Sequence, residues 1–272
     1  MISVLILTLN EEKNIGACLD SVAWSDDVVV LDSGSDDRTV EIARDRGARI
    51  LRRPFDTFAR QRNYGLDEGN LRHDWVLHLD ADERVPPALR DEMTAVLGDT
   101  SKSAFRVPSK LMFQGTWLKY SGMYPTYQVR LGRRDALRFD QVGHGQRGAL
   151  PNEEVGTLDE PLVHYAFSKG IADWIDRHNR YSTDEARYAM KVRRAEIAWG
   201  ALFTGAPSER RRALKDLSYR LPLRPLWRFL YVYVLRLGIL DGRAGLTYAT
   251  MLAMYEYMID LKIRHRRRAR DE

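Results

Sequence analysis

Residues 75–85 read WVLHLDADERV, an apolar run that passes directly into two aspartates one residue apart. A continuous apolar run of this kind is typical of a strand buried on both faces of a sheet. Comparable runs, and segments with helical spacing between them, occur at residues 2–9, 27–32 and 48–51 and at 11–22, 36–47 and 57–69. Because strands alternate with helices, the sequence predicts an α/β fold with a mainly parallel sheet that helices cover on both faces.

The regular alternation ends near Val96. Residues 103–166 contain short strand-like pieces interrupted by Gly, Pro and aromatic residues, and from about residue 170 the spacing becomes helical. The sequence contains no internal repeat and no low-complexity linker. We therefore expect a sheet domain at residues 1–168 and a helical, basic C-terminal region at 169–272.

The composition is that of a globular protein. Of the 272 residues, 44% are hydrophobic, which is enough for a sizeable core and excludes a disordered or fibrous protein. The single cysteine, Cys18, excludes an internal disulfide and favours a reducing compartment. The N-terminal MISVLILTLNEE lacks a basic leader and a small-residue cleavage site, so we expect a first strand there and not a signal peptide.

The net charge of +5 is unevenly distributed along the chain. Residues 1–190 hold 25 Lys and Arg against 30 Asp and Glu, whereas residues 191–272 hold 18 against 8 and end in a basic tail that includes KIRHRRRAR. Such a region predicts an anionic partner, either nucleic acid or anionic lipid.

Two apolar segments of the C-terminal region, 226–240 and 244–263, are candidates for membrane contact. A bilayer span needs about 20 predominantly apolar residues, and each charge near its centre costs roughly 2.5–3.5 kcal/mol. Both segments are interrupted by charged residues, namely Arg228, Arg236, Glu256 and Asp260. We therefore expect helices that lie in the interface at the inner face of the cytoplasmic membrane, with arginines reaching lipid phosphates. The alternative is a helical subdomain with a solvated tail.

Polar residues follow three of the predicted strands at the point where each strand ends. These strand ends read Thr8-Leu9-Asn10-Glu11, Asp32-Ser33-Gly34-Ser35 and Asp80-Ala81-Asp82-Glu83. Because ligands of open parallel sheets bind at the carboxyl ends of the strands, the three polar stretches should converge on one edge and form a site there.

The pair Asp80 and Asp82 forms a DxD motif at its strand end. Two carboxylates in this arrangement can hold a hard divalent cation such as Mg²⁺, which uses one or two carboxylates together with substrate phosphates. A lone DxD is weak evidence, because it also occurs as a helix N-cap. Asp32 lies before the cap of the next helix, so capping does not explain it, and its carboxylate could accept a hydrogen bond from a nucleobase imide or a ribose hydroxyl. The sequence has no GxGxxG and no P-loop motif at this edge.

The segments VLILTLNEEKNIGACLDSV, DDVVVLDSGSDDRTVEIA, FARQRNYGL and DWVLHLDADERV strongly resemble family 2 glycosyltransferases with the GT-A fold. Later pieces, among them FQGTWLKYSGMYPTYQVRL, RFDQVGH, LVHYAFSKGIADWIDRHNRYS and LGILDGRAGL, resemble the branch of bacterial lipopolysaccharide-core glucosyltransferases and related surface-polysaccharide enzymes. The resemblance covers nearly the whole chain in the same motif order.

This resemblance implies an enzyme that transfers a sugar, with inversion, from a nucleotide-sugar to an acceptor hydroxyl. It implies a nucleotide-sugar site formed by Thr8, Asn10, Glu11, Asp32, Arg60, Asn63, Asp80, Ala81 and Arg130. In that site Asp32 reads the base, and Asp82, with Asp80 beside it, ligates Mg²⁺ or Mn²⁺. A cation there would stabilise the charge that develops on the leaving diphosphate. For Arg130 a solvated arginine is the alternative.

The general base is the point where this sequence departs from the resembling branch, in which a Glu follows the His of the segment after RFD. Here Gly145 follows His144. His144 itself can serve as the base, because the imidazole pKa needs little tuning. A nearby carboxylate is the alternative, and the candidates are Asp140, Glu83, Glu153 and Glu154. A third possibility is that His144 is an ordinary loop histidine and the acceptor is held differently.

Several further residues are candidates for acceptor contact. Aromatic faces suit sugar C–H surfaces, and one or two of Trp117, Tyr120, Tyr124 and Tyr127 are expected to touch the acceptor, the others forming local core. His164 and Tyr165 are interpreted as structural. His178, Asn179 and Arg180 contact acceptor phosphates or face solvent. The expected acceptor is a glycan or lipid-linked precursor, with an anionic membrane surface and no nucleic acid as the further partner.

Two other classes of protein compete with this reading. A phosphohydrolase with an aspartate pair would carry its DxD after the first strand, whereas here the motif follows the fourth. A basic membrane- or nucleic-acid-binding protein without transferase activity would explain the C-terminal region but not the three polar strand ends.

Overall fold

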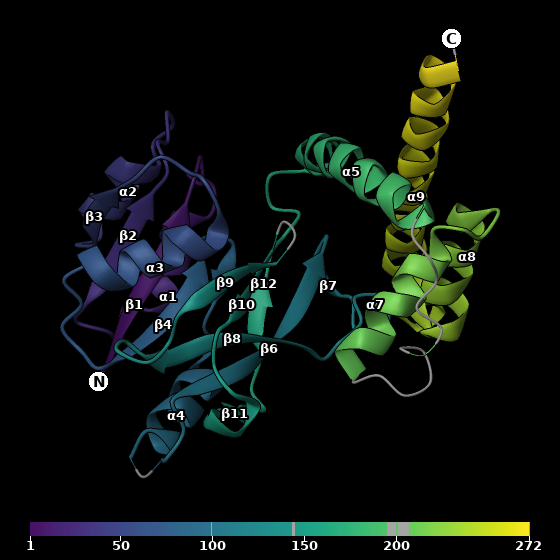
Figure 1. Cartoon of the computed structure of the whole chain (residues 1–272). Helices are drawn as coiled ribbons and strands as arrows, with labels where there is room; N and C mark the ends of the chain where they lie inside the picture. The colour runs from purple at the N-terminus through teal and green to yellow at the C-terminus, as the bar shows by residue number, and fades with distance from the viewer. Residues whose placement is uncertain (99, 143–144, 195–199, 201–206, 272) are drawn as a thin grey trace. The chain divides into compact units, whose positions relative to one another are not determined.

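The computed structural model describes residues 1–98, 100–142, 145–194, 200 and 207–271 (Figure 1). The chain divides into two compact units. The first comprises residues 1–117 and 124–168, and the second comprises residues 118–123 and 169–272. Segment 118–123 therefore belongs to the helical unit, although its position in the sequence falls within the sheet domain.

The first unit begins with the predicted alternation of strands and helices. The strands are β1 Ile2–Thr8, β2 Val28–Asp32, β3 Arg49–Arg52 and β4 Trp75–Asp80, and the helices are α1 Ile15–Ser21, α2 Thr39–Asp45 and α3 Phe58–Glu68. All four strands are parallel, in the order β3-β2-β1-β4. Helix α3 begins where the Thr57 side chain accepts a hydrogen bond from the Arg60 amide, and α2 is followed by Gly47 at φ +79°, a conformation that glycine adopts readily.

The remaining elements of the first unit follow β4 in the chain. They are β5 Glu83–Arg84, α4 Pro87–Val96, β6 Ala104–Phe113, β7 Thr116–Trp117, β8 Thr126–Arg133, β9 Phe139–Val142, β10 Gly145–Gly148, the 3-10 turn η1 Asn152–Glu154, β11 Val155–Thr157 and β12 Leu162–His164. Strand β8 is antiparallel and lies between β4 and β6, and the order continues β6-β12-β5. Strands β9 and β10 form a separate antiparallel hairpin.

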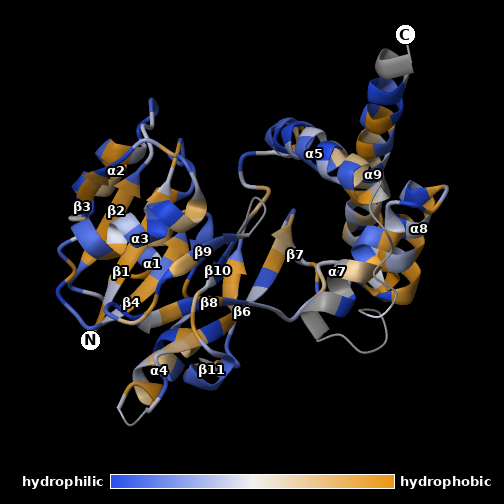
Figure 2. Cartoon of the chain, in the orientation of Figure 1, coloured by the Kyte–Doolittle hydropathy of each residue, from blue (hydrophilic) through white to orange (hydrophobic). Residues whose placement is uncertain are grey.

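The central strands are buried on both faces, as their continuous apolar sequence predicts (Figure 2). Successive side chains point to opposite faces of a strand, so Val4 and Ile6 pack with α1 and α4, while Leu5 packs under α3. The close approach of α3 requires Gly65, because a Cβ atom at that position would overlap the Leu5 side chain. These contacts fix the strand ends that carry the polar residues.

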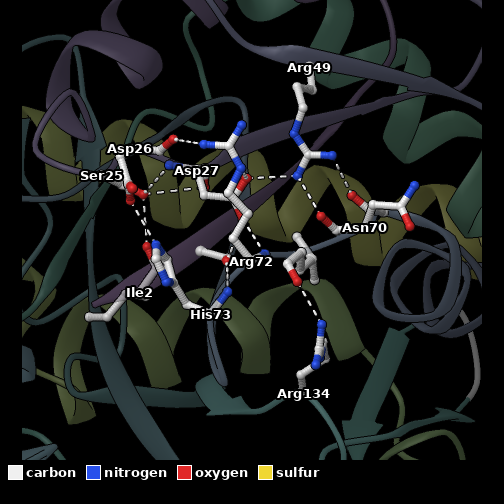
Figure 3. A network of polar contacts seen from close by, with 12 residues as sticks. Ile2, Ser25, Asp26, Asp27, Arg49, Asn70, Arg72, His73 and Arg134 are labelled. Carbon is white, nitrogen blue, oxygen red and sulfur yellow. Dashed lines mark hydrogen bonds and ion pairs between the residues drawn. The ribbon is translucent and has the colours of Figure 1, made fainter.

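At the amino edge of the sheet, a polar network closes the starts of β1 and β2 (Figure 3). Its centre is the buried carboxylate of Asp27, which accepts hydrogen bonds from the Ser3 hydroxyl at 2.5 Å, the Arg72 amide at 2.7 Å and the Arg49 guanidinium at 2.7 Å. These hydrogen bonds outweigh burial and lower the pKa of Asp27. The charge is therefore fully compensated within the unit.

The second unit is helical. It contains α5 Ile171–Arg194, α7 Pro207–Ser218, α8 Arg224–Leu230, the π-turn η2 Tyr231–Leu235, the 3-10 turn η3 Gly238–Asp241 and α9 Gly242–Asp271. Its small core includes Ala186, Tyr219 and Ile259. The carboxylate of Asp241 holds segment 118–123, because it accepts hydrogen bonds from the Ser121 amide at 2.7 Å and the Ser121 hydroxyl at 2.6 Å. Across the described parts of the chain, every helix falls short of the uninterrupted apolar length that a bilayer crossing requires.

Candidate active site

The three polar strand ends meet at the carboxyl edge of the parallel strands. Thr8 is the register partner of Asp32, and Leu7, its neighbour, is the partner of Asp80. The ends of β2, β1 and β4 therefore lie side by side, as the parallel arrangement predicts. Two clusters occupy this edge, one around Asp32 and one around Asp80.

The Asp32 cluster organises the loop after β2. The buried carboxylate accepts hydrogen bonds from the Thr8 hydroxyl at 3.2 Å, the Ser35 hydroxyl at 2.5 Å, and the amides of Gly34 and Ser35, each at 3.0 Å. Asp32 does not cap the next helix, because α2 begins at Thr39 with Arg38 at its N-cap position; its carboxylate instead anchors the turn at 33–35. Recognition of a nucleobase by Asp32 remains a prediction.

Asn10 and Glu11 fasten the loop after β1 to the loop after β2. Asn10 adopts φ +54°, a left-handed conformation that asparagine tolerates, and its side-chain oxygen accepts a hydrogen bond from the Asp36 amide at 3.0 Å. The Glu11 amide donates to the Thr39 hydroxyl at 2.7 Å. The two loops therefore form one preorganised rim beside Thr8 and Asp32.

The Asp80 cluster is a buried ion-pair network. Asp80 accepts from the Arg62 guanidinium at 2.7 Å through one carboxylate oxygen and from the Arg130 guanidinium at 2.8 Å through the other. Arg130 also donates to Glu83 at 2.6 Å. The side chains of Arg62, Arg130 and Glu83 are 1%, 4% and 2% exposed, whereas that of Asp80 is 35% exposed. Asp80 is therefore the member of the network that a ligand can reach.

Burial and mutual charge set the protonation of this network. Burial raises the pKa of Asp80 by itself, but the charges of Arg130 and Arg62 hold that pKa well below its usual range. Burial lowers the pKa of Arg62 to about 10. Burial raises the pKa of Glu83, and Arg130 opposes that rise. Asp80 is thus ionised at neutral pH and held in one orientation by two cations.

Glu83 belongs to the scaffold of this network. One of its carboxylate oxygens accepts from Arg130, and the other accepts from the Asp80 amide at 3.0 Å. Because the side chain is 2% exposed, it holds the turn at residues 80–83 and presents no open oxygen to an acceptor. The prediction of Glu83 as a general base finds no support in this geometry.

Asp82 and His164 form a carboxylate–imidazole pair next to Asp80. His164 Nε2 lies 3.3 Å from Asp82 Oδ2, and the Tyr165 amide donates to the Asp82 carbonyl at 2.8 Å. Burial lowers the pKa of His164 by itself, but the hydrogen bond and negative charge of Asp82 raise that pKa to about 9. The contact arises because β12 pairs with β5, which places His164 opposite Glu83. Sequence reasoning treated His164 as structural and missed this neighbour of the DxD motif.

The structure places Arg60 and Asn63 differently from Arg62, although all three belong to α3. Arg60 is 73% exposed and lies 3.5 Å from Asp56. The Asn63 amide group binds both backbone groups of Phe139, at 2.9 and 3.0 Å. Arg62, which the sequence analysis did not single out, reaches the site. Its spacing from Ala59 and Leu66, which are also buried, places it on the apolar face of α3, and that was the available signal.

Ala81 contributes no side chain to the predicted nucleotide-sugar site. It is 2% exposed and packs in the core, while its carbonyl accepts a hydrogen bond from Arg84 at 2.9 Å. Arg130, by contrast, is buried in the Asp80 network, so the alternative of a solvated arginine is wrong.

Among the candidate general bases other than Glu83, Asp140 follows a residue that contacts the Asp80 network. It is an exposed residue of β9 that follows Phe139, whose ring lies 5.7 Å from the Arg62 guanidinium. His144 lies outside the described residues. Glu154 accepts a hydrogen bond from the Ser103 hydroxyl at 2.8 Å, at the start of β6.

Among the acceptor candidates, Trp117 and Tyr124 stack edge to face in the first unit, with ring centroids 5.0 Å apart. Tyr127 is 41% exposed. Tyr120 belongs to the second unit, where its amide donates to Asp241. His178 stacks on Trp174, and Asn179 accepts from Lys262 at 2.7 Å, so these two side chains are engaged within the helical unit.

The carboxyl edge offers a partial metal site. Among the residues that the structure describes, no cluster of three or more His, Cys, Asp or Glu has metal-binding geometry. Asp82 and His164 nevertheless provide one carboxylate and one imidazole side by side, with the partly exposed Asp80 adjacent. Mg²⁺ and similar cations keep water and take oxygen ligands from substrate phosphates. Asp82, with Asp80 beside it, therefore supplies carboxylates that could ligate a divalent cation together with the oxygens of a diphosphate.

An α/β unit with polar and acidic side chains gathered at the carboxyl edge of its parallel strands has its expected ligand site at that edge. The model of glycosyl transferase family 2 matches residues 3–143. The chain therefore belongs to glycosyltransferase family 2, and the resemblance seen in the sequence is confirmed. Membership in this family also decides against a phosphohydrolase and against a binding protein without transferase activity.

Two relatives and one solved structure illustrate the similarity. An uncharacterized glycosyltransferase of Rickettsia typhi is 24% identical over 97% of this chain and 86% of its own length. The lipopolysaccharide core biosynthesis glycosyltransferase LpsC of Rhizobium meliloti is 26% identical over 75% of this chain and 77% of its own length. Glucosyl-3-phosphoglycerate synthase from Mycobacterium tuberculosis, in complex with Mn²⁺, UDP and glucosyl-3-phosphoglycerate, is 19% identical over 61% of this chain and 72% of that chain, with a TM-score of 0.45.

Proposed function

We propose that this enzyme transfers a sugar, with inversion, from a nucleoside diphosphate donor to a hydroxyl of a cell-surface glycan precursor, assisted by Mg²⁺ or Mn²⁺. The observation that carries the proposal is the register of Thr8, Asp32 and Asp80 on one edge, with the Asp82–His164 contact beside them. A nucleoside and a diphosphate need these two environments: hydrogen-bonding groups for the first and a cation site for the second.

The nucleoside occupies the rim formed by Thr8, Asn10, Glu11 and Asp32. Hydrogen-bonding groups on two fastened loops select a base and a ribose at small entropic cost, because the loops are already ordered. The diphosphate lies at the DxD motif. Asp82 would hold the cation, and His164 would join it only after losing the proton that Asp82 stabilises; the cation would neutralise charge on the leaving group. Arg62 and Arg130 act beneath the site, where they fix Asp80 in its orientation.

The acceptor hydroxyl loses its proton to a general base while its oxygen forms a bond to the anomeric carbon and the bond from that carbon to the diphosphate breaks. Asp140 and His144 are the two candidates, and we retain both. Asp140→Asn and His144→Gln distinguish them, because loss of the base lowers kcat without weakening donor binding. If neither variant lowers kcat, Glu153 and Glu154 become the remaining carboxylates to substitute.

The proposed acceptor class follows from the resemblance to lipopolysaccharide-core enzymes and from the relative LpsC, which is named for lipopolysaccharide core biosynthesis. A lipid-linked acceptor also suits the basic, apolar second unit. Donor nucleotide, sugar and linkage are the specific points that experiment must supply.

The proposal is tested by calorimetric titration of UDP, GDP, CDP and dTDP, each with and without Mn²⁺. We expect one nucleotide to bind much more tightly than the others and to require the cation. Absence of binding by all four, in the presence of Mn²⁺ and a crude acceptor extract, would overturn the assignment of the carboxyl edge as a donor site. Asp67→Asn is the control variant for substitutions at the carboxyl edge. It replaces an exposed aspartate of α3 whose ion pair with Arg138 lies outside the Asp32 and Asp80 clusters.

A further inference from the structure

We infer that the second unit carries a preformed surface for anionic membranes, made by the α8–η2 stripe, the η3 turn and the α9 stripe. The α8–η2 stripe comprises Leu223, Leu226, Trp227, Tyr231, Val234 and Leu235. The α9 stripe comprises Leu246, Met254, Tyr257 and Leu261. The inference is independent of the proposed sugar transfer, because it depends only on the second unit.

The first observation is a concentration of exposed apolar side chains. Of the 24 large hydrophobic residues that are exposed among the described residues, 14 lie between residues 221 and 261, and ten of these lie between 221 and 240. Leu223, Leu235 and Leu240 are 68%, 74% and 61% exposed. Scattered single exposures are ordinary on soluble proteins, but a dense group such as this marks a contact surface.

The second observation is that these residues follow helical periodicity. The members of the α8–η2 stripe recur largely at intervals of three and four residues, and Val232, with Phe229 and Tyr233 packed beside it, faces the interior of the unit. On α9, Met254, Tyr257 and Leu261 recur in the same way, while Glu256, Ile259 and Ile263 face the interior. Each helix therefore has one inner face packed on the unit and one apolar outer stripe. Figure 2 shows hydrophobic residues recurring along both helices.

The third observation is that the backbone holds the leucines outward. Leu223 and Leu237, at the two ends of the α8–η2 segment, adopt φ +51° and +58°. Leucine rarely adopts this left-handed conformation, and such strain is retained where the surrounding structure enforces it for function. Leu237 is followed by Ile239 and Leu240 of η3, both of which are more than half exposed.

Buried polar contacts fasten the elements that carry these leucines. Arg224 pairs with Glu256 at 2.9 Å, with both side chains about nine-tenths buried, and its guanidinium lies 4.0 Å from the Tyr219 ring centroid. These contacts fasten α8 to α9. The hydrogen bonds of Asp241 to Ser121 fasten η3. The apolar surface is thus rigid before it meets a partner, which lowers the entropic cost of binding.

Charge decides which partner fits. The exposed Arg243, Arg264 and Arg267 make no ion pair with a carboxylate among the described residues, Asp241 and Glu256 are turned to inner partners, and the half-buried Asp260 is the remaining acid on the described part of α9 before its basic end. A surface of apolar stripes with unpaired arginines matches anionic headgroups above an acyl layer. A second copy of the same surface would bring like charges together, so a symmetric dimer is disfavoured.

The test is co-sedimentation of the full-length enzyme with vesicles of phosphatidylglycerol and phosphatidylethanolamine, compared with vesicles of phosphatidylcholine alone. We expect binding to the anionic vesicles and much weaker binding to the neutral ones. The double variant Leu235→Ser/Leu240→Ser should bind the anionic vesicles at least about tenfold more weakly, because two apolar side chains no longer enter the acyl layer. Its matched control is Ile175→Ser/Leu214→Ser, which alters exposed residues of α5 and α7 and should bind like the wild type.

The contribution of charge is tested by Arg243→Gln/Arg264→Gln, which should weaken binding to anionic vesicles by about fivefold for each arginine. Arg38→Gln/Arg90→Gln in the first unit is the control. Unchanged sedimentation of either test variant, with circular dichroism confirming that it is folded, would overturn the inference. A concentration-dependent dimer in analytical ultracentrifugation that Leu235→Ser/Leu240→Ser abolishes, without any vesicle binding, would overturn it in favour of a second copy.

Discussion

The two edges of the same sheet both bury charge, and they do so differently. At the amino edge, Asp27 is surrounded by donors from Ser3, Arg49 and Arg72, and no buried atom of this group lacks a partner. At the carboxyl edge, Arg62 Nε and Nη1 and Arg130 Nη1 are buried without a hydrogen-bond partner among the described residues. Both ring nitrogens of His78, two residues before Asp80, are also buried without a hydrogen-bond partner among the described residues. Burial, together with the nearby Arg62 and Arg130 guanidiniums, lowers the pKa of His78.

We interpret the Asp27 network as structural and the Asp80 network as part of the proposed site. A compensated network such as that of Asp27 adds stability and is complete without a ligand. Unsatisfied donors are rare in native proteins and call for an explanation. At the carboxyl edge they lie beneath Asp80, which is one-third exposed, so stability has been given up at the place where a charged substrate is expected to bind.

The largest effect should come from Asp82→Asn, which removes the proposed cation ligand from the carboxyl edge. We expect turnover in saturating Mn²⁺ to fall by about a thousandfold, because charge on the leaving diphosphate is no longer neutralised. Asp82→Asn also removes the charged partner of His164 and should lower the free energy of unfolding, so turnover is compared per folded enzyme. The control Asp67→Asn should retain wild-type turnover. Wild-type activity of Asp82→Asn, or of the unmodified enzyme in excess chelator, would refute the metal role.

A smaller effect should distinguish the two edges by stability. Arg130→Met leaves Asp80 and Glu83 without their shared cation and should lower the free energy of unfolding by roughly 3–5 kcal/mol. Asp27→Ala should cost about 2 kcal/mol, because Ser3 and the Arg72 amide lose their acceptor. Urea unfolding measures both changes. Arg38→Met, which breaks an exposed pair with Glu41, serves as the control and should cost less than about 1 kcal/mol.

Activity provides the second half of this comparison. The folded fraction of Asp27→Ala should retain kcat, whereas that of Arg130→Met should lose it, because Asp80 is no longer held in place. Equal loss of kcat in both variants would show that the two edges do not differ as described.

The smallest effect concerns pH. Asp82 raises the pKa of His164 from about 6.5 to about 9 in the folded, metal-free enzyme. The stabilisation from the charged pair is therefore fully present below about pH 6.5 and is lost as the pH rises through about 9. We expect the free energy of unfolding to decline across this interval. His164→Gln and Asp82→Asn should each flatten the decline, and an unchanged slope in both would contradict the pairing.

Much of the first unit could be predicted from the sequence, because its strands are continuous apolar runs separated by helices of clear periodicity. The parallel order then brought Thr8, Asp32 and Asp80 together without further information. The sequence pattern is less informative about which face of a helix a given residue occupies. On α3 the predicted Arg60 is exposed, whereas Arg62, which was not predicted, is buried in the Asp80 network.

The contacts that sequence could not supply are those made by non-local pairing. His164 reaches Asp82 only because β12 pairs with β5, two strands far apart in the chain. Segment 118–123 joins the second unit only because Asp241 binds its backbone. Asp32 anchors its own loop through side-chain to backbone hydrogen bonds, which residue type alone does not reveal. Each of these depends on geometry that forms after the sheet is assembled.

The central claim is that the carboxyl edge holds an incomplete cation site that the donor diphosphate completes. Electron paramagnetic resonance of free Mn²⁺ measures it directly, with the protein titrated in the absence and presence of the nucleoside diphosphate that binds best. We predict weak Mn²⁺ binding alone and at least about tenfold tighter binding with the nucleotide, and, by reciprocity, the same gain for the nucleotide when Mn²⁺ is present. Asp82→Asn should remove the gain. Equal Mn²⁺ affinity with and without the nucleotide would contradict completion of the cation site by the donor diphosphate.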